Sequence, residues 1–359
     1  MAEKNIPLIG GGKKERQSNI EALRLLSMLM VLNLHSFWGY NHGSGFLQAA
    51  DFFRESTSIC AVNAFLLISG YFGIKWKFKS FYNLIFQLFF YAFGVYIVAA
   101  TLGFIELTTH GLLTNITCLY KHWGFITNYL LLYMMSPMFN ALADKLESRK
   151  LLTTIFILFT SEWIITRGFD FLNYGLIYLI GRFIRKTNAI ENLKINATKG
   201  YWLTTTIIFL LVYLFFLFTP FKKANLMWDN PLGYNYGGPF VILQAIFIFL
   251  MFARMNFTNR FINWCATSCL SIFLIHMHPV VKNYYYKFTE NLYNFNPITH
   301  AIVLILLIVS VFIGCILIDK IRIFISDLTY ALLCKVKHLL PERLFRLDTY
   351  LPLVVKKII

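Results

Sequence analysis

The sequence predicts an all-α fold, a polytopic membrane helix bundle of about ten transmembrane helices with both termini in the cytoplasm. Three observations predict it. Of the 359 residues, 58% are hydrophobic and only 14% are charged, which is more apolar surface than one water-soluble core can bury. Apolar stretches long enough for a hydrocarbon core of about 30 Å recur along the chain. Lys and Arg gather in alternate connections, as expected of cytoplasmic loops.

The connections carry a strong charge bias. With the N-terminus inside, 25 of the 33 Lys and Arg residues fall on cytoplasmic segments, counting Arg182 and Arg254 at the cytoplasmic ends of their spans; 7 fall outside, and Arg24 lies within the first span. The opposite orientation would invert this bias, so the net charge of +16 indicates topology rather than a nucleic-acid partner. The expected spans are Ile20–Trp38, Thr57–Ile74, Phe81–Ile105, Gly124–Asn140, Leu151–Thr166, Phe171–Ile184, Tyr201–Thr219, Gly238–Met255, Phe261–Val281 and Ile298–Ile318.

Three segments are expected: a cytoplasmic N-terminal segment at 1–19, one transmembrane domain at 20–318, and a basic amphipathic cytoplasmic tail at 319–359. The tail alternates apolar and basic residues, which is typical of a helix on the inner leaflet; a plain topogenic anchor is the alternative. The polar start lacks the short apolar core of a cleavable signal peptide. The six cysteines show no paired spacing, so neither a metal site nor a disulfide framework is predicted.

The first span contains Arg24 and His35, two side chains that are costly inside a membrane and therefore functional candidates. Eleven helical positions at about 100° each bring both side chains to one face, separated by a rise of about 16.5 Å. The topology places Arg24 near the cytoplasmic end and His35 near the outer end. Arg24 either extends to the interface or binds phosphate, for which a guanidinium is well suited. His35 either faces lipid head groups or acts as a general base.

The start of the first span contains Ser18 and Glu21 at the spacing of a capping box. In that motif the serine oxygen accepts a bond from a free amide of the first turn, and the glutamate reaches back to another. The alternative for Glu21 is an i,i+3 ion pair with Arg24, which would lower the cost of burying the arginine.

The second span ends with Ser69 and Gly70, small residues that permit close approach of a neighbouring helix. Lys75, Lys77 and Lys79 then alternate with aromatic residues at the predicted cytoplasmic exit. These lysines are expected to anchor the helix and to attract anions beside Arg24, so both roles can coexist.

Four further residues are candidates for the substrate site. Trp123 opens the fourth span, where it is either an interfacial belt residue or a platform for a sugar ring. Glu162 lies in the fifth span and needs a partner there. Tyr133, with Ser69 and Asn63, is a candidate stabiliser of an oxyanion. His276 lies in the ninth span; His278, two positions later, points to a different face, so the two histidines are not expected to share a metal.

Four blocks, taken in order, make the chain resemble the acyltransferase-3 family of bacterial integral membrane O-acyltransferases. Each block is short, but their order and spacing across most of the chain are specific. The blocks are the Arg and His separated by ten residues (Arg24, His35), the S-G-F/Y element (Ser69, Gly70, Tyr71), the aromatic block ending in Ser-Pro (Trp123, Tyr129, Tyr133, Ser136, Pro137), and Ser271–Pro279.

The resemblance implies about ten helices in the bacterial cytoplasmic (inner) membrane, acetyl-CoA as the cytoplasmic acyl donor, and a hydroxyl of a surface or lipid-linked glycan as acceptor. It also implies that Arg24 and His35 are essential. The family often has an R-x-x-R element after the serine-glycine motif, whereas here Lys75, Lys77 and Lys79 follow it. Lysines supply charge but no bidentate fork. The chain resembles the short members that act on capsule, exopolysaccharide or O-antigen.

The expected mechanism has Arg24 and the three lysines hold the donor phosphates while His35 serves as general base or transient acyl carrier. No metal and no nucleic acid take part. The main rival function is a transporter or flippase for lipid-linked saccharides, which would more often show paired halves with broken helices. A non-enzymatic scaffold of polysaccharide assembly is a third possibility. An acyltransferase that uses a histidine late in the chain is the nearest enzymatic alternative, and it would depend on His276 instead of His35.

Overall fold

The computed structural model describes residues 16–36, 45–116, 123–165, 170–218 and 232–335. Every regular element in these ranges is a helix, which confirms the all-α class. Most of the expected N-terminal segment and residues 336–359 of the expected tail lie outside the described part. The helices are α1 Ser18–His35, α2 Gly45–Ser58, α3 Ala61–Phe72, α4 Phe78–Thr101, α5 Thr109–Ile116, α6 Gly124–Lys145, α7 Ser148–Ile165, α8 Phe171–Lys186, α9 Ala189–Asn192, α10 Ala197–Phe218, α12 Pro239–Ala253, α13 Arg260–Ala266, α14 Cys269–His276, α15 Pro279–Asn291 and α16 Pro297–Lys335.

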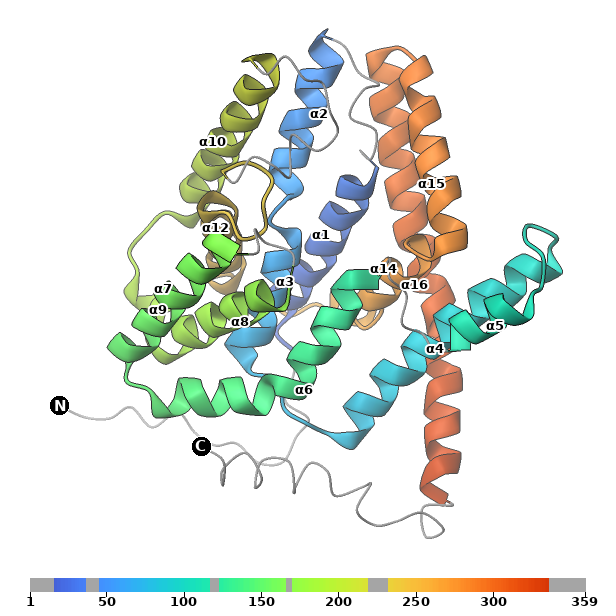
Figure 1. Ribbon diagram of the computed structural model, residues 1–359, viewed down its shortest axis with the longest axis horizontal. Coiled ribbons are helices and arrows are strands. Elements are labelled where there is room, and N and C mark those ends of the chain that lie inside the picture. Colours follow the sequence, from blue (N-terminus) through green and yellow to red (C-terminus); the bar gives the residue numbers. More distant parts are fainter. Residues whose placement is uncertain (1–15, 37–44, 117–122, 166–169, 219–231, 336–359) are drawn as a thin grey trace.

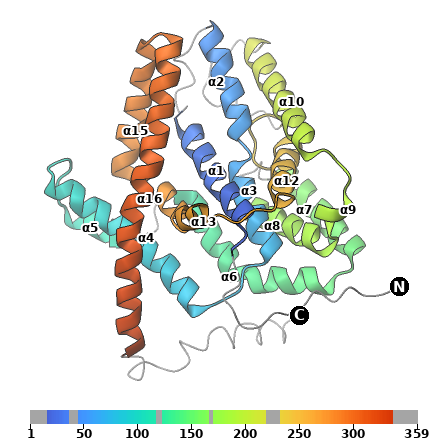
Figure 2. The same cartoon turned by 180° about the vertical axis from the view of Figure 1, so that it is seen from behind.

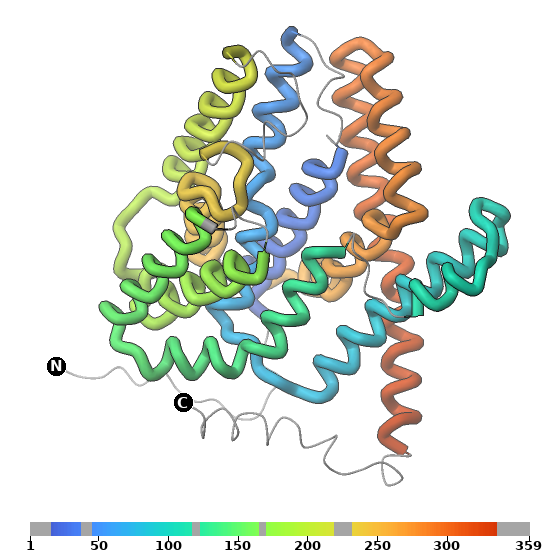
Figure 3. Tube along the Cα trace, in the orientation of Figure 1, coloured from blue at the N-terminus to red at the C-terminus, as the bar shows by residue number. Residues whose placement is uncertain are grey.

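The described helices support a membrane protein, but they vary in length. Three of them, α4, α10 and α16, are long and apolar enough to cross a membrane, and a bent pair made of 260–276 and 279–294 brings the number to four. The count of ten spans and the cytoplasmic placement of the termini therefore stay predictions. The expected span at 57–74 is the end of α2 followed by α3, and Figure 3 shows α2 leading into α3 with little change of direction.

The centre of the bundle is built on a close crossing of α3 and α8. A Cβ atom on Gly70 would lie 2.1 Å from the backbone oxygen of Tyr178, and one on Gly181 would lie 2.6 Å from the backbone oxygen of Leu67. Only glycine allows backbones to approach this closely. The packing role predicted for Gly70 is thus confirmed. Figure 1 shows α1 and α3 in the middle of the molecule, with α4 and α5 extending to one side.

The first turn of α1 differs from the capping-box prediction. The N-cap is Gln17, and its side chain makes no capping bond. The Ser18 hydroxyl instead accepts a bond from the backbone N–H of Asn259 at 2.8 Å and donates to the Asn259 carbonyl at 3.4 Å. The prediction was wrong because a distant segment, just before α13, competes for the serine. Glu21 makes the alternative i,i+3 pair, at 3.2 Å from Arg24 Nη1.

The long helix α16 runs without a break from Pro297 to Lys335, so the expected boundary at 318–319 falls inside one helix (Figure 2). Just beyond that boundary Asp319 and Arg322 form a bidentate ion pair with two distances of 2.9 Å. Asp319 also accepts a bond from Tyr91 of α4 at 2.7 Å. All three side chains are buried, and the interaction joins α16 to α4.

Pro137 interrupts the hydrogen bonding of α6. Because proline has no N–H, the carbonyl of Tyr133, four residues earlier, receives no bond from it. Two side chains bond that oxygen instead: the Ser136 hydroxyl at 2.7 Å and the Trp76 indole at 3.1 Å. The Ser-Pro pair therefore creates an acceptor on α6 for the loop between α3 and α4.

Candidate functional site

The central finding is that His35 and His276 are in direct contact. The Nδ1 atom of His35 lies 2.7 Å from the Nε2 atom of His276, although the residues are 241 positions apart. His35 is the last residue of α1, and His276 is the last residue of α14. The two histidines therefore form one site rather than belonging to two alternative ones.

Pro279 explains why α14 ends at His276. It begins α15, and the residue before it, His278, is extended, so α14 must end. The chain turns by 83° between the two halves of this segment. Broken backbone at membrane depth requires substitute partners for its polar groups. Here the Trp123 indole donates to the carbonyl of Met277, within the break, at 3.2 Å.

The neighbours of His276 determine where the protons lie. Its Nδ1 contacts the backbone carbonyl of Ile272, and because a carbonyl only accepts, Nδ1 carries the proton and Nε2 offers its lone pair. His35 Nδ1 must then be the donor in the contact with His276. In the neutral pair, Nε2 of His35 is left unprotonated, and no residue in the described part bonds it. That nitrogen is placed to accept a proton.

The last turn of α1 is held by neighbouring helices, which orients His35. Arg54 of α2 donates through Nη1 to the carbonyl of Asn33 at 3.2 Å, and to the side chains of Asn33 and Ser36 at 2.6 Å each. The Tyr285 hydroxyl donates to the carbonyl of Leu32 at 2.9 Å. A cation and a hydroxyl thus add bonds to two carbonyls of the last turn, which also accept from the Ser36 N–H. Sequence reasoning missed Arg54; its i,i+3 spacing from buried Asp51 was the available clue.

Arg24 lies three turns earlier on the same continuous helix, so the predicted spacing between Arg24 and His35 follows from α1 itself. The ion pair with Glu21 uses only Nη1. Within the described residues, Nη2 and Nε of Arg24 have no partner, and the side chain is 33% exposed. These open donors fit an anion that reaches the helix from outside the bundle.

The loop after α3 is braced by α6 and α8. The Ile74 N–H donates to the Tyr178 hydroxyl at 2.8 Å, and the Asn140 amide donates to the Ile74 carbonyl at 2.9 Å. Lys75 and Lys77 are exposed, and so is Lys79 in the first turn of α4, which lies 3.7 Å from Asp327 of α16. The loop of residues 73–77, called the lysine loop below, is therefore held at its backbone while its two lysines stay open.

Two arginines of α8 approach this same region, and sequence reasoning did not single them out. Arg182 Nη1 would lie 2.8 Å from a Cβ on Gly73, and its Nη2 pairs with Asp144 at 2.6 Å. Arg185 lies over the Tyr71 ring, 5.1 Å from its centroid. These guanidinium groups lie beside the end of α3 and the residue that follows it, but they come from another helix. The RFIRK sequence in 182–186 was the available pattern.

The remaining predicted site residues are spread over the bundle. Ser69 bonds the Phe65 carbonyl at 3.0 Å, and Tyr133 packs against Trp76 beside the lysine loop, with ring centroids 5.3 Å apart. Trp123 is fully buried. Glu162 is also fully buried and packs so tightly on Gly237 that a Cβ there would lie 2.0 Å from its carboxylate.

His278 turns away from His276, as expected, and its Nε2 bonds the Ala92 carbonyl at 3.2 Å. Within the described ranges, no group of three or more His, Cys, Asp or Glu side chains gathers as a metal site.

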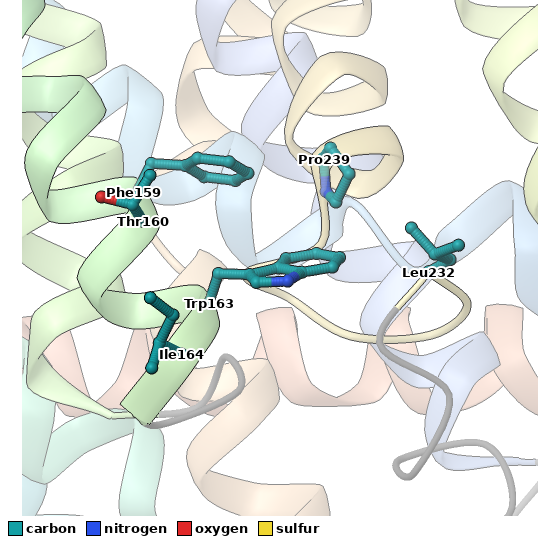
Figure 4. A pocket seen from close by; sticks show the side chains of 6 residues that line it. All are labelled: Phe159, Thr160, Trp163, Ile164, Leu232 and Pro239. Carbon is teal, nitrogen blue, oxygen red and sulfur yellow. The ribbon is translucent and has the colours of Figure 1, made fainter.

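One open crevice of about 520 Å³ lies between α7 and the start of α12. Figure 4 shows Phe159 and Trp163 extending from α7 toward Pro239. Its lining is almost entirely apolar and includes no acid or base, so the crevice cannot supply the chemistry that the two histidines offer. The lining residues are Phe159, Thr160, Trp163, Ile164, Leu232 and Pro239.

Comparison with known proteins agrees with these features. No curated protein and no solved structure matched the chain. The sequence model of the acyltransferase-3 family, described as an acyltransferase domain, matches residues 17–320, a range that begins just before α1 and contains Arg24, His35 and His276. The match covers most of the chain, and the protein therefore belongs to the acyltransferase-3 family.

Proposed function

We propose that the protein is a membrane O-acyltransferase that moves an acetyl group from cytoplasmic acetyl-CoA to a hydroxyl of a surface or lipid-linked glycan at the bacterial cytoplasmic membrane. Membership of the acyltransferase family supports the reaction class. The observation that carries the proposal is the 2.7 Å contact between His35 and His276, which leaves Nε2 of His35 as a base.

The proposed reaction is direct transfer. Nε2 of His35 accepts the proton of the acceptor hydroxyl while the hydroxyl oxygen attacks the thioester carbonyl carbon. The tetrahedral intermediate then collapses, the carbon–sulfur bond breaks, and the thiolate of coenzyme A takes the proton from the His35 imidazolium. His276 accepts the bond from His35 Nδ1 throughout and stabilises the charged ring. One ester and one thiol are formed, and His35 returns to its neutral state.

The proposed donor site lies at the cytoplasmic end of α1. The open nitrogens of Arg24 would bind phosphate groups, with Lys75 and Lys77 adding charge. Arg182 and Arg185 of α8 add the bidentate forks that lysines lack. A donor held there would place its acyl end along α1 toward His35, over a rise of about 16.5 Å.

The test compares O-acetyl content of the host's surface glycan by proton NMR in four strains: one without the gene, and three carrying the wild type, His35→Ala or His110→Ala. His110 is an exposed histidine of α5 and serves as the matched control. We expect the deletion and His35→Ala to lose the acetyl signal, while His110→Ala keeps it, at equal protein abundance in the membrane. A fully active His35→Ala protein would refute the proposed base. A deletion that alters no glycan acetylation would favour the transporter or flippase interpretation.

A further inference from the structure

A second group of buried polar residues lies around the irregular segment 232–238, which precedes α12. Tyr234, Asn235 and Tyr236 of this segment are all buried. The Tyr234 hydroxyl donates to the Phe52 carbonyl of α2 at 2.6 Å, and the Tyr236 carbonyl accepts a bond from Asn63 of α3 at 2.7 Å. Irregular backbone inside a membrane protein is tolerated where it is buried in protein or lines a polar cavity. The segment is thus held between α2 and α3.

Two oxygen acceptors beside this segment have no donor within the described part of the chain. They are Oε2 of Glu55, whose residue is 7% exposed, and Oδ1 of Asn63, whose residue is fully buried. The orientation of Asn63 is determined by its partner, because its amide nitrogen must face the Tyr236 carbonyl. Ser56, the residue after Glu55, bonds the Tyr234 hydroxyl of the same segment at 3.0 Å. The free oxygens therefore belong to one neighbourhood.

Leaving buried acceptors without a donor is costly, and an ionisable group inside a membrane bundle is costlier still. A ligand that satisfies these two oxygens must carry at least two hydrogen-bond donors, such as O–H groups. Phosphate and carboxylate ligands are disfavoured next to a carboxylate. A polyhydroxyl compound such as a sugar matches both requirements.

Aromatic rings connect this neighbourhood to the catalytic pair. The Phe273 ring lies 6.2 Å from the His35 ring, Phe125 lies 5.3 Å from Phe273, and Tyr174 lies 5.9 Å from Phe125, all measured between centroids. Tyr174 in turn lies within electrostatic range of Tyr236, and no described residue bonds its buried hydroxyl. Apolar faces of sugar rings pack well on such surfaces. A chain of packed aromatic rings thus extends from His35 toward Tyr236 and Glu55.

We propose that Glu55 and Asn63, beside the segment 232–238, bind hydroxyl groups of the sugar acceptor and orient it toward His35. The inference rests on the proposed function, since it names the residues that would hold the acceptor. Glu55 is a binding residue here and takes no part in proton transfer.

The test uses the purified full-length protein in nanodiscs with labelled acetyl-CoA and a de-O-acetylated glycan extract of the host as acceptor. Glu55→Gln preserves the volume but replaces one carboxyl oxygen with an amide N–H donor. We expect its apparent KM for the extract to rise about tenfold, as for the loss of one hydrogen bond to a buried acceptor. The KM for acetyl-CoA, which binds elsewhere in the proposed reaction, should be unchanged. Glu106→Gln, at an exposed position, is the matched control.

The outcomes separate this inference from the proposed function. A wild type that labels no glycan refutes the proposed function, and the inference with it. A wild type that labels glycan while Glu55→Gln has an unchanged KM for the extract refutes only the inference. The inference is also refuted if removing sodium or other cations raises the wild-type KM for the extract as much as Glu55→Gln does. In that case the oxygens would hold a cation. Should Glu55→Gln fail to give monodisperse protein, Glu55→Asp keeps the charge, shortens the reach and must raise the same KM.

Discussion

Nδ1 of His35 and Nε2 of His276 lie 2.7 Å apart. Because the Ile272 carbonyl accepts a bond from Nδ1 of His276, Nε2 of His276 is the acceptor and Nδ1 of His35 is the donor in this contact. In the proposed reaction, His276 therefore acts as a positioning residue for His35.

The first prediction follows from this arrangement. His276→Ala should lower kcat by about 10- to 100-fold, the usual effect of losing a partner that orients a reactive histidine, while the KM for acetyl-CoA stays near the wild-type value. His276→Gln, which can still accept a bond from His35, should retain more activity than His276→Ala. Steady-state kinetics in membranes check this order. Equal kcat in all three proteins would show that the contact has no part in the reaction.

The second prediction concerns Arg185 at the proposed donor site. Arg185→Ala should raise the KM for acetyl-CoA about tenfold with little change in kcat, because a charge-assisted contact to phosphate is lost. The effect should shrink at high ionic strength, which screens exposed charges. Arg149→Ala removes an exposed cation of α7 and is the control. The same rise in KM in both variants would indicate a general charge effect and no site at Arg185.

The third prediction concerns the crossing of α3 and α8. Gly181→Ala must push Leu67 or Tyr71 backbone atoms away, since a Cβ would lie 2.6 to 2.7 Å from them. We expect a loss of about 1 to 3 kcal/mol of stability, seen as a lower thermal unfolding midpoint of the purified protein. Gly94→Ala in α4 meets nothing within 4 Å and should be neutral or stabilising. Equal midpoints for Gly181→Ala and the wild type would contradict the close crossing.

The fourth prediction concerns the buried pair of Asp319 and Arg322. Asp319→Asn leaves the arginine charge uncompensated and should destabilise the protein by about 3 to 5 kcal/mol. Replacing both residues together, as Asp319→Leu with Arg322→Met, should recover most of that loss. Unfolding midpoints of the single and double variants provide the check. A double variant no better than Asp319→Asn would mean that Tyr91, which also bonds Asp319, dominates the interaction.

The sequence predicted those relationships that lie within one helix. Arg24 and His35 share α1, and His276 and His278 diverge because they are two positions apart. For Glu21 the favoured capping box was wrong, and the alternative i,i+3 pair with Arg24 is the one observed. Helical geometry is local and regular, so spacing alone determines such relationships.

Contacts between distant segments could not be predicted in this way. The pairing of His35 with His276 depends on a bend at Pro279 and on how α14 packs against α1, neither of which has a local pattern. Ser18 matched a capping motif, yet a segment 241 positions away takes its hydroxyl. Arg182 reaches the lysine loop only because Gly70 and Gly181 let α3 and α8 nearly touch. In each case tertiary packing overrides or completes the local preference.

The part of α6 before Pro137 touches two separate regions. At its start, the Trp123 indole bonds the Met277 carbonyl beside His276; three turns later, the Tyr133 carbonyl accepts a bond from Trp76 in the loop that bears Lys75 and Lys77. A helix of this length is stiff compared with the hydrogen bonds at its ends. A shift of the lysine loop must therefore either break the bond to Trp76 or, transmitted through α6, move the Met277 carbonyl next to His276. The lysine loop and the carbonyl beside His276 are in this way mechanically coupled through α6.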